Sequence, residues 1–347
     1  MTYTLPSEDL EHVLKHAASA WEGLRSQRIF LTGATGFFGR WLLETIAYAN
    51  DRLALGCEVW ILVRSPERFA SEAPHLAQRA DFFQWPGDVR SFAFPPGHFS
   101  HVIHAATVSS HYVSSEENVD TIVNGTRRVL AFCEAAGLER LLFVSSGAVY
   151  GPQPPDMPTL SETYLGGPDP TALASAYAES KRMAELLCVI AANQSRFKLT
   201  IARCFAFVGP YLPLETHFAI GNFMRDVLAQ RDIRISGHGQ VFRSYLYAAD
   251  LAVWLWQILC RGQTGQAYNV GSDQAISLHA LAEKMRVHAA VPVTVQIAEQ
   301  ASPDMPRQAY VPNIERARTH LGLEVKVSLD QAITKTLRWH RTHHQVS

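Results

Sequence analysis

The sequence predicts an α/β protein built on a doubly wound parallel sheet. Short apolar runs alternate with helical segments, and a glycine-rich turn joins the first run to the helix that follows it. Parallel strands that are buried on both faces read as continuous apolar runs. Runs that alternate with helices indicate crossover connections, which place helices on both faces of the sheet.

The elements follow in a regular order along the chain. A leading amphipathic helix is expected over residues 6–23, with Leu10, Val13 and Leu14 on one side. Buried strands are expected at residues 28–31, 58–64, 101–106, 140–146 and 199–205. Helices are expected at residues 40–46, 116–136 and 170–192.

Beyond residue 205 the pattern changes, because Pro210, Pro213, Gly237 and Gly239 interrupt the alternation. Helices are expected at residues 219–230, 249–261 and 278–289, with short strands between them. We expect a larger domain over 1–203, to which segments near 240–272 return, and a smaller mixed α/β substrate-binding lobe over 204–347. Such a lobe over the carboxyl edge of a parallel sheet encloses the usual place for a ligand. Residues 152–170 are expected as a loop near that site, and residues 339–344 as a frayed end rather than a metal site.

The composition excludes several kinds of partner. The net charge is -1 over 347 residues, so no global field attracts nucleic acid or an anionic membrane. The five cysteines form no C-x-x-C pair, which favours reduced thiols and the cytoplasm. No apolar stretch reaches membrane-spanning length, and residues 1–28 lack the apolar core of a signal peptide. We expect a cytoplasmic protein without a nucleic-acid partner, membrane partner or metal.

The glycine-rich turn predicts a dinucleotide-binding, Rossmann-type site. Its glycines are Gly33, Gly36 and Gly39, and a strand precedes them and a helix follows. The first glycine permits the tight turn, the second lets the backbone approach the pyrophosphate, and the third allows close helix–strand packing. The expected cofactor contacts of this turn are Gly33, Thr35, Gly36, Phe37, Phe38 and Gly39.

Two further motifs carry groups for proton transfer. Tyr177 and Lys181 stand four residues apart on one helix face, and a nearby positive charge lowers the pKa of a phenol. Ser146 follows a buried strand at the edge where the cofactor is expected. Taken alone, Tyr177 and Lys181 would be typical of a pair on an exposed surface. Ser146 alone would be typical of an ordinary strand end.

Together, the order and spacing of these motifs resemble the extended short-chain dehydrogenase/reductase family, from Ile29 to about Trp339. The resemblance implies that Tyr177 is the acid/base, that Lys181 holds the nicotinamide ribose and that Ser146 orients a sugar oxygen. It implies a proton-relay role for Asn124. It also implies cofactor contacts from Asp88, Val89, His104, Ala105 and Ala106.

The second lobe is similar to family members that bind nucleotide-diphosphate sugars. Asn222 matches a residue that holds the nucleotide, and Arg243 would clamp the diphosphate; a surface salt bridge is the alternative for Arg243. Ala206 and Ser244 depart from the family pattern. Gly147 and Ala148 stand where dehydratases carry Asp-Glu and decarboxylases usually carry Glu. Because neither residue transfers protons, dehydratase chemistry is disfavoured.

The resemblance implies NAD or NADP as cofactor. Arg64 follows the second strand, where NAD enzymes usually carry an acid, so it slightly favours NADP; stacking on adenine is the alternative. We expect a nucleotide-sugar 4-epimerase. The alternatives are an NADPH-dependent 4-keto-sugar reductase and a catalytically silent, NAD(P)-sensing binding protein. A homodimer paired through residues 116–136 and 170–192 is expected.

Overall fold

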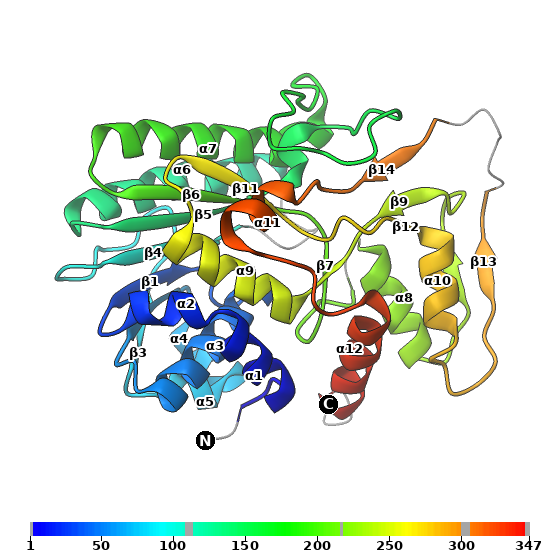
Figure 1. Ribbon diagram of the computed structural model, residues 1–347, viewed down its shortest axis with the longest axis horizontal. Coiled ribbons are helices and arrows are strands. Elements are labelled where there is room, and N and C mark those ends of the chain that lie inside the picture. The colour runs from blue at the N-terminus through cyan, green and yellow to red at the C-terminus, as the bar shows by residue number, and fades with distance from the viewer. Residues whose placement is uncertain (1–2, 108–113, 216–217, 300–305, 344–347) are drawn as a thin grey trace.

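A seven-stranded parallel sheet forms the centre of the protein. The computed structural model describes residues 3–107, 114–215, 218–299 and 306–343. The strand order is β3-β2-β1-β4-β5-β6-β11, and every pairing is parallel (Figure 1). The strands are β1 (Arg28–Thr32), β2 (Glu58–Val63), β3 (Phe82–Pro86), β4 (His101–His104), β5 (Arg140–Ser146), β6 (Lys198–Cys204) and β11 (Gln266–Val270). The predicted doubly wound fold is confirmed.

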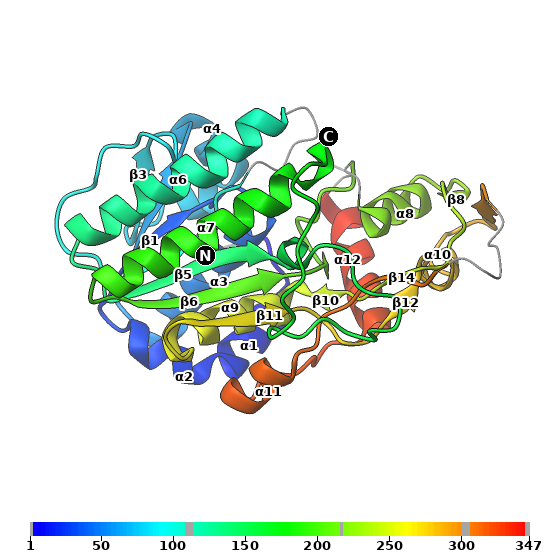
Figure 2. The same cartoon turned by 90° about the horizontal axis from the view of Figure 1, so that it is seen from above.

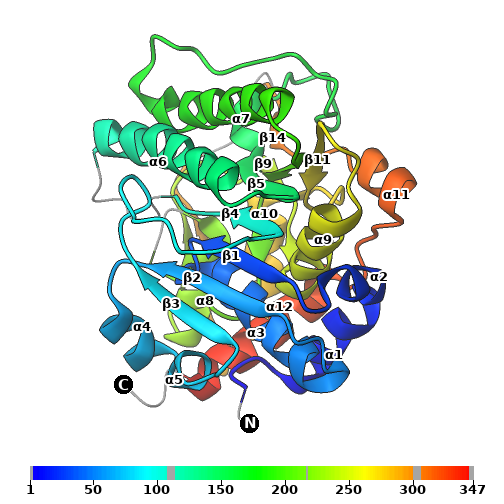
Figure 3. The ribbon, with the colours of Figure 1, turned by 90° about the vertical axis from the view of Figure 1, so that its left-hand side faces the viewer.

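Helices cover both faces of this sheet (Figure 3). One face carries α6 (Ser115–Ala135) and α7 (Ala176–Gln194), which pack side by side. The other carries α3 (Phe37–Leu53), α9 (Ala248–Arg261) and α1 (Ser7–His16), while α4 (Pro66–Glu72) and α5 (Pro74–Ala77) connect β2 to β3. Because both faces are covered, the inner strands β1, β4 and β5 are almost fully buried, which explains their apolar sequences, whereas the edge strand β3 is mostly exposed or half-buried.

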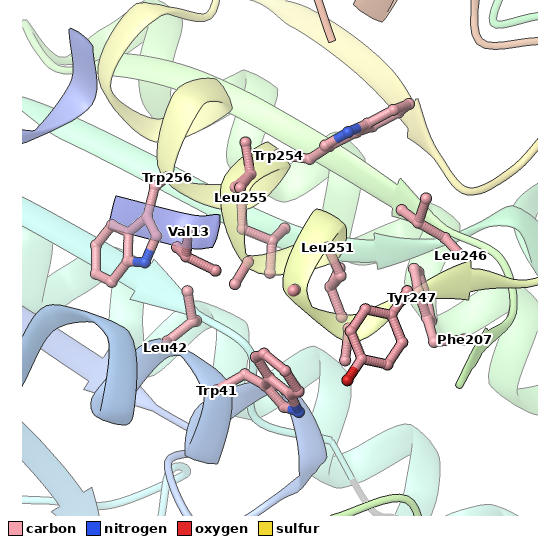
Figure 4. Close-up of a cluster of buried hydrophobic side chains, with 14 of the residues drawn as sticks. Val13, Trp41, Leu42, Phe207, Leu246, Tyr247, Leu251, Trp254, Leu255 and Trp256 are labelled. Carbon is pink, nitrogen blue, oxygen red and sulfur yellow. The ribbon is translucent and has the colours of Figure 1, made fainter. Parts of the chain in front are cut away.

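The face under α3 and α9 holds a core rich in tryptophan (Figure 4). Trp41, Trp254 and Trp256 are fully buried. Each indole needs a partner for its N–H in such a place. The indole of Trp41 donates to the Pro210 carbonyl oxygen at 2.9 Å, and that of Trp256 donates to the Thr45 hydroxyl at 3.0 Å. The Trp41 bond fixes the start of the second lobe against the helix after the glycine turn.

The smaller lobe lies beside the carboxyl edge of the sheet (Figures 1 and 2). Its three-stranded sheet has the order β12-β9-β14, and two short pairs are β7 with β10 and β8 with β13. These strands are β7 (Phe207–Val208), β8 (Ile233–Ile235), β9 (Val241–Arg243), β10 (Leu246–Tyr247), β12 (Ile276–Ser277), β13 (Val295–Ile297) and β14 (Gln308–Tyr310). Its helices are α8 (Ala219–Leu228), α10 (Leu278–Arg286) and α12 (Leu329–His343), while α11 (Glu315–Leu321) packs beside β11 and α9 of the large sheet (Figure 3).

Three sequence expectations need correction. The leading helix is broken into α1, α2 (Ala18–Trp21) and a 3₁₀ turn at Glu22–Leu24. The helix expected from residue 170 begins at Ala176, after a 3₁₀ turn. The frayed end expected from residue 339 is wrong as far as residue 343, because Trp339 and His340 are buried in α12.

The N-terminal helix ties the two lobes together. Asp9 on α1 is buried and accepts hydrogen bonds from Tyr247 at 2.7 Å and from Lys335 on α12 at 2.9 Å. Glu8 also pairs with Lys335 and Arg338. Within the described residues, no helix is long and apolar enough to cross a membrane.

Candidate active site

The glycine turn has the close packing that its sequence predicts. Gly33 has a φ of 75°, and a Cβ there would lie 2.6 Å from the backbone of Ala105. At Gly39 an added Cβ would lie 2.4 Å from the Gly33 carbonyl oxygen. At Gly36 an added Cβ would meet only that same oxygen, at 3.5 Å, among the described residues. The space over the N-terminus of α3 is therefore open where a side chain would otherwise fill it.

This space fits a dinucleotide pyrophosphate. Gly36 precedes α3, and no side chain of the described residues caps the helix. Thr35 and Gly36 are exposed, while Phe37 and Phe38 pack their rings against the core. Uncapped N–H groups and the positive end of a helix bind phosphate.

The next strand supports the turn from the side. The ring of His104 is buried between two hydroxyls, Thr32 Oγ1 at 2.8 Å and Thr126 Oγ1 at 3.1 Å. Burial, with a smaller contribution from the Lys181 charge, lowers the pKa of His104 to about 3, so the ring is neutral. Ala106 N–H also donates to Thr32. The side chain of His104 therefore holds the strand ends in place, so that Ala105 and Ala106 lie against Gly33 beside the glycine turn.

At the adenosine side, Asp88 follows β3. Its carboxylate accepts from Arg90 at 2.7 Å, and the hydrogen bond with Arg90 is the main reason that the pKa of Asp88 is lowered. The charge of Arg64 contributes to the same lowering. Arg64 is exposed at the end of β2, whereas Val89 is buried against Gly125. Asp88 and Arg64 therefore stand at the same edge of the sheet, and Val89 is a packing residue.

Ser146 and Tyr177 meet at the carboxyl end of β5. A hydrogen-bonding interaction with Ser146 lowers the pKa of Tyr177, but burial has the larger effect, so the pKa is raised overall. Ser146 Oγ also accepts from Ala148 N–H at 3.1 Å. The phenol is therefore not pre-ionised by the chain alone, contrary to the expected lowering by its helix neighbour.

Lys181 lies one helical turn after Tyr177 and is fully buried. Its Nζ donates to the Val144 carbonyl oxygen at 2.9 Å, and burial lowers its pKa to about 8. Behind it Glu185 accepts from Arg203 at 2.7 Å and from Ser145. An ammonium has three donors, so two of those on Nζ remain for a ligand.

The smaller lobe brings an arginine toward the same edge. Arg243 on β9 makes no ion pair with a carboxylate in the described part of the chain, and burial lowers its pKa. The expected alternative, a surface salt bridge, is therefore not what the structure has. A half-buried guanidinium without a carboxylate is suited to an anionic ligand. Asn222 is half-buried on α8 of the same lobe.

Comparison with known proteins decides the family. The sequence matches the NAD dependent epimerase/dehydratase family over residues 29–271. The chain belongs to that family. It is 30% identical over 217 residues to UDP-glucuronic acid decarboxylase 6 of Arabidopsis thaliana, covering 62% of each protein. It is 25% identical to UDP-glucuronic acid decarboxylase 1 of Xenopus tropicalis, over 91% of this chain and 72% of that protein.

The fold is shared with solved structures. One is UDP-glucuronic acid 4-epimerase from Bacillus cereus in complex with NAD, with a TM-score of 0.76 at 19% identity, over 91% of this chain and 99% of that one. Membership of the NAD dependent epimerase/dehydratase family confirms the expected family resemblance and the expected cofactor class, NAD or NADP. Within this family, the glycine turn, Asp88 and the edge of Ala105 and Ala106 would hold the cofactor.

Asn124 does not take part in this arrangement. Its side chain is exposed on α6 and donates to Asp120 at 2.6 Å. It lines an outward cavity of about 810 Å³ together with Arg90, Arg127 and other residues. Its helix neighbours Gly125 and Thr126 face the sheet instead, because successive helical residues point about 100° apart. The expected relay role of Asn124 behind the buried Lys181 is therefore withdrawn.

Sequence reasoning did not identify Tyr310, which reaches the same site from β14. A hydrogen-bonding interaction with Ser146 and the charge of Arg243 both act on its phenol, although burial raises its pKa overall. Its ring packs on Phe205, with the centroids 4.6 Å apart. No motif surrounds Tyr310 in the sequence, and only the pairing of β14 with β9 places it here.

Proposed function

We propose that this protein is a nucleotide-sugar 4-epimerase that works by hydride transfer at the sugar C4. The observation that carries the proposal is the meeting of Ser146 and Tyr177 at the carboxyl end of β5, on the sheet edge that carries the open glycine turn. The glycine turn and Lys181 would hold the cofactor, which would supply reversible hydride transfer at C4.

The residues of the chain transfer the proton and hold the cofactor and the sugar in position. Tyr177 would remove the proton of the C4 hydroxyl and later return it, while Ser146 hydrogen-bonds that oxygen. Because burial raises the pKa of Tyr177, ionisation of the phenol needs the positive charge of the oxidised cofactor. Lys181 Nζ donates one hydrogen bond to the Val144 carbonyl oxygen, and its other two N–H groups would bind the nicotinamide ribose. Arg243 would bind the diphosphate, with Asn222 toward the nucleotide.

Gly147 and Ala148 favour this chemistry over the activities of the relatives. UDP-glucuronic acid decarboxylases are among the proteins similar in sequence, yet the pair next to Ser146 offers no acid or base. Redox at C4 alone needs only Ser146, Tyr177 and Lys181. The same residues would serve a 4-keto-sugar reductase working in one direction, and Arg64 at the end of β2 favours that second candidate through NADPH.

The test is a panel of UDP-, dTDP-, GDP- and CDP-sugars, including UDP-glucuronic acid, assayed with NAD and NADP. Interconversion of C4 epimers without net use of cofactor supports the proposal. Consumption of NADPH by a 4-keto sugar supports the reductase, and release of carbon dioxide from UDP-glucuronic acid supports a decarboxylase. Tyr177→Phe is the matched variant. Turnover that survives this change would refute the proposed role of the phenol and revive the silent binding protein.

We also propose a cytoplasmic homodimer. The exposed side of α7 carries Met183, Leu186, Val189 and Ile190, which is more apolar surface than a solvated helix needs. All five cysteines are free, as expected in a reducing compartment. Light scattering at micromolar concentration should give the mass of a dimer, and Leu186→Glu should give a monomer. A wild-type monomer would refute the proposal.

A further inference from the structure

An ion pair between Glu185 on α7 and Arg203 on β6 lies behind the candidate active site. Arg203 donates to the two carboxylate oxygens of Glu185, through Nη2 at 2.7 Å and through Nε at 3.0 Å, which is the bidentate geometry of strong pairs. The two side chains are only 11% and 19% exposed. A buried ion pair is weak evidence of added stability, because the cost of removing both charges from water offsets much of their attraction. The position of this pair therefore calls for another explanation.

The pair contacts both ends of the segment that carries Ser146. Before Ser146, the Ser145 hydroxyl donates to Glu185 Oε1 at 2.5 Å. After it, Tyr150 at the end of the next 3₁₀ turn accepts from Arg203 Nη1 at 3.0 Å. Ser145 and Arg203 are also direct partners in the pairing of β5 with β6. The backbone on either side of Ser146 is therefore tied to one pair of charges.

The same segment holds Lys181. The ammonium of Lys181 donates to the carbonyl oxygen of Val144, the residue before Ser145. Glu185 follows Lys181 by one helical turn, so α7 carries both the lysine and the carboxylate that binds the strand of its acceptor. Glu185 therefore joins α7 to β5 next to the point where Lys181 does, and a shift of β5 along α7 would break both contacts.

The far side of the pair is also held. The Tyr150 hydroxyl donates to Asn269 Oδ1 at 2.8 Å, and Asn269 Nδ2 donates to the carbonyl oxygens of Leu160 at 2.8 Å and Asn313 at 3.0 Å. Tyr150 is 1% exposed and Asn269 is fully buried. Because these buried hydrogen bonds leave Tyr150 little freedom to move, Arg203 is anchored at one end to a rigid group.

We propose that Glu185 and Arg203 are positioning residues, which hold Ser146 and Lys181 at the spacing that the reaction needs. This inference rests on the proposed function for the roles of Ser146 and Lys181, but not for the geometry. A displacement of about 1 Å at the reacting groups can cost about 100-fold in rate. A rigid support behind the site therefore has a large effect on turnover without contact with the substrate.

Two variants separate this role from a general loss of stability. Glu185→Gln keeps the shape of the side chain and removes the charge that binds Arg203. Asp250→Asn is the matched control, because Asp250 is a carboxylate of 1% exposure that pairs with His12 at 2.7 Å, at the start of α9 on the other face of the sheet. Both variants should unfold at lower urea concentration than wild type, because each breaks a buried pair. Only Glu185→Gln should change the active site.

The first measurement is the dissociation constant of NAD and of NADP by calorimetry, without a sugar. Displacement of Lys181 should weaken binding of the preferred cofactor by about tenfold in Glu185→Gln, whereas Asp250→Asn should bind it as wild type does. Unchanged affinity in Glu185→Gln, or an equal loss in both variants, refutes the proposal. If Glu185→Gln does not fold, Glu185→Met combined with Arg203→Met takes its place, because apolar side chains of similar volume can replace a buried pair without loss of the fold.

The second measurement is turnover of the nucleotide sugar found in the panel. Glu185→Gln should lower kcat by about 10–100-fold with little change in the KM for the sugar, because Arg243 still binds the diphosphate. Ser145→Ala should also lower kcat, and the double variant should lose no more than Glu185→Gln alone, because the carboxylate acts through that hydroxyl. Losses that multiply overturn the positioning role. Weakened cofactor binding in Glu185→Gln, in a protein that turns over no nucleotide sugar, supports the positioning role and refutes the proposed function alone.

Discussion

Replacing Lys181 with methionine should stabilise the protein while it removes activity. Lys181 is 2% exposed, and burial lowers its pKa from 10.5 to about 8. Below pH 8 the lysine is charged in both the folded and the unfolded chain, so the folded state bears the full cost of the buried charge. Each pKa unit corresponds to about 1.4 kcal/mol. The buried charge of Lys181 therefore lowers the free energy of unfolding by roughly 3 kcal/mol at pH 7.

The sign of the pH dependence follows from this lowering. Between pH 8 and 10.5 the folded protein releases the proton of Lys181 and the unfolded chain keeps it, so wild type gains stability relative to the variant. Urea unfolding of wild type and Lys181→Met should therefore show an advantage of the variant at pH 7. This advantage should shrink by about 2–3 kcal/mol by pH 10. Comparing the two proteins at each pH cancels the titration of the other groups.

Lys284→Met is the matched control, because Lys284 is exposed and pairs with Asp330 on the surface. It removes a lysine without removing a buried charge, so it should give no gain in stability at pH 7. If the advantage of Lys181→Met were constant or grew with pH, the pKa of Lys181 in the folded protein would not be lowered. The account of a buried ammonium that destabilises the folded state would then be wrong.

Three further predictions concern the ligand contacts. Gly39→Ala should destabilise the protein by about 1–3 kcal/mol in thermal unfolding and weaken cofactor binding, because its Cβ would overlap Gly33; Gly237→Ala, with nothing within 4 Å, should do neither. Arg243→Ala should raise the KM for the nucleotide sugar by about 10–100-fold and leave cofactor affinity unchanged; an unchanged KM would exclude diphosphate binding there. Arg64→Ala should weaken NADP binding by about tenfold and NAD binding much less in calorimetry, and equal losses would favour adenine stacking.

The fold could be predicted because its signals are local. The strands β1, β2 and β5 each contain a continuous apolar run, and the glycine turn marks the first crossover. The error at the C-terminus has a physical cause. The segment 339–343 is rich in histidine and polar groups, and nothing local shows that Trp339 packs on Tyr211, with ring centroids 4.9 Å apart. Tertiary packing buries that helix.

Some residues of the candidate site could be predicted from local motifs, and others depend on tertiary packing. Ser146 and Tyr177 belong to motifs with fixed spacing, and the structure brings them together. The relay role of Asn124 was implied by the family resemblance, but its position on α6 turns its side chain outward, where it donates to Asp120. Tyr310 has no motif, since its position depends on a pairing between strands far apart in the chain. Residues of that kind are found only once the smaller lobe is in three dimensions.

The contact between α1 and α12 restricts how the two lobes move. A rotation that parted these helices would leave Asp9 as a buried carboxylate without the ammonium of Lys335. Breaking such a buried pair typically costs about 3–5 kcal/mol. Any closing of the smaller lobe over a nucleotide that keeps this pair must therefore pivot near α1 and α12, so that α10 and β13, which lie further from α12, travel furthest (Figure 1).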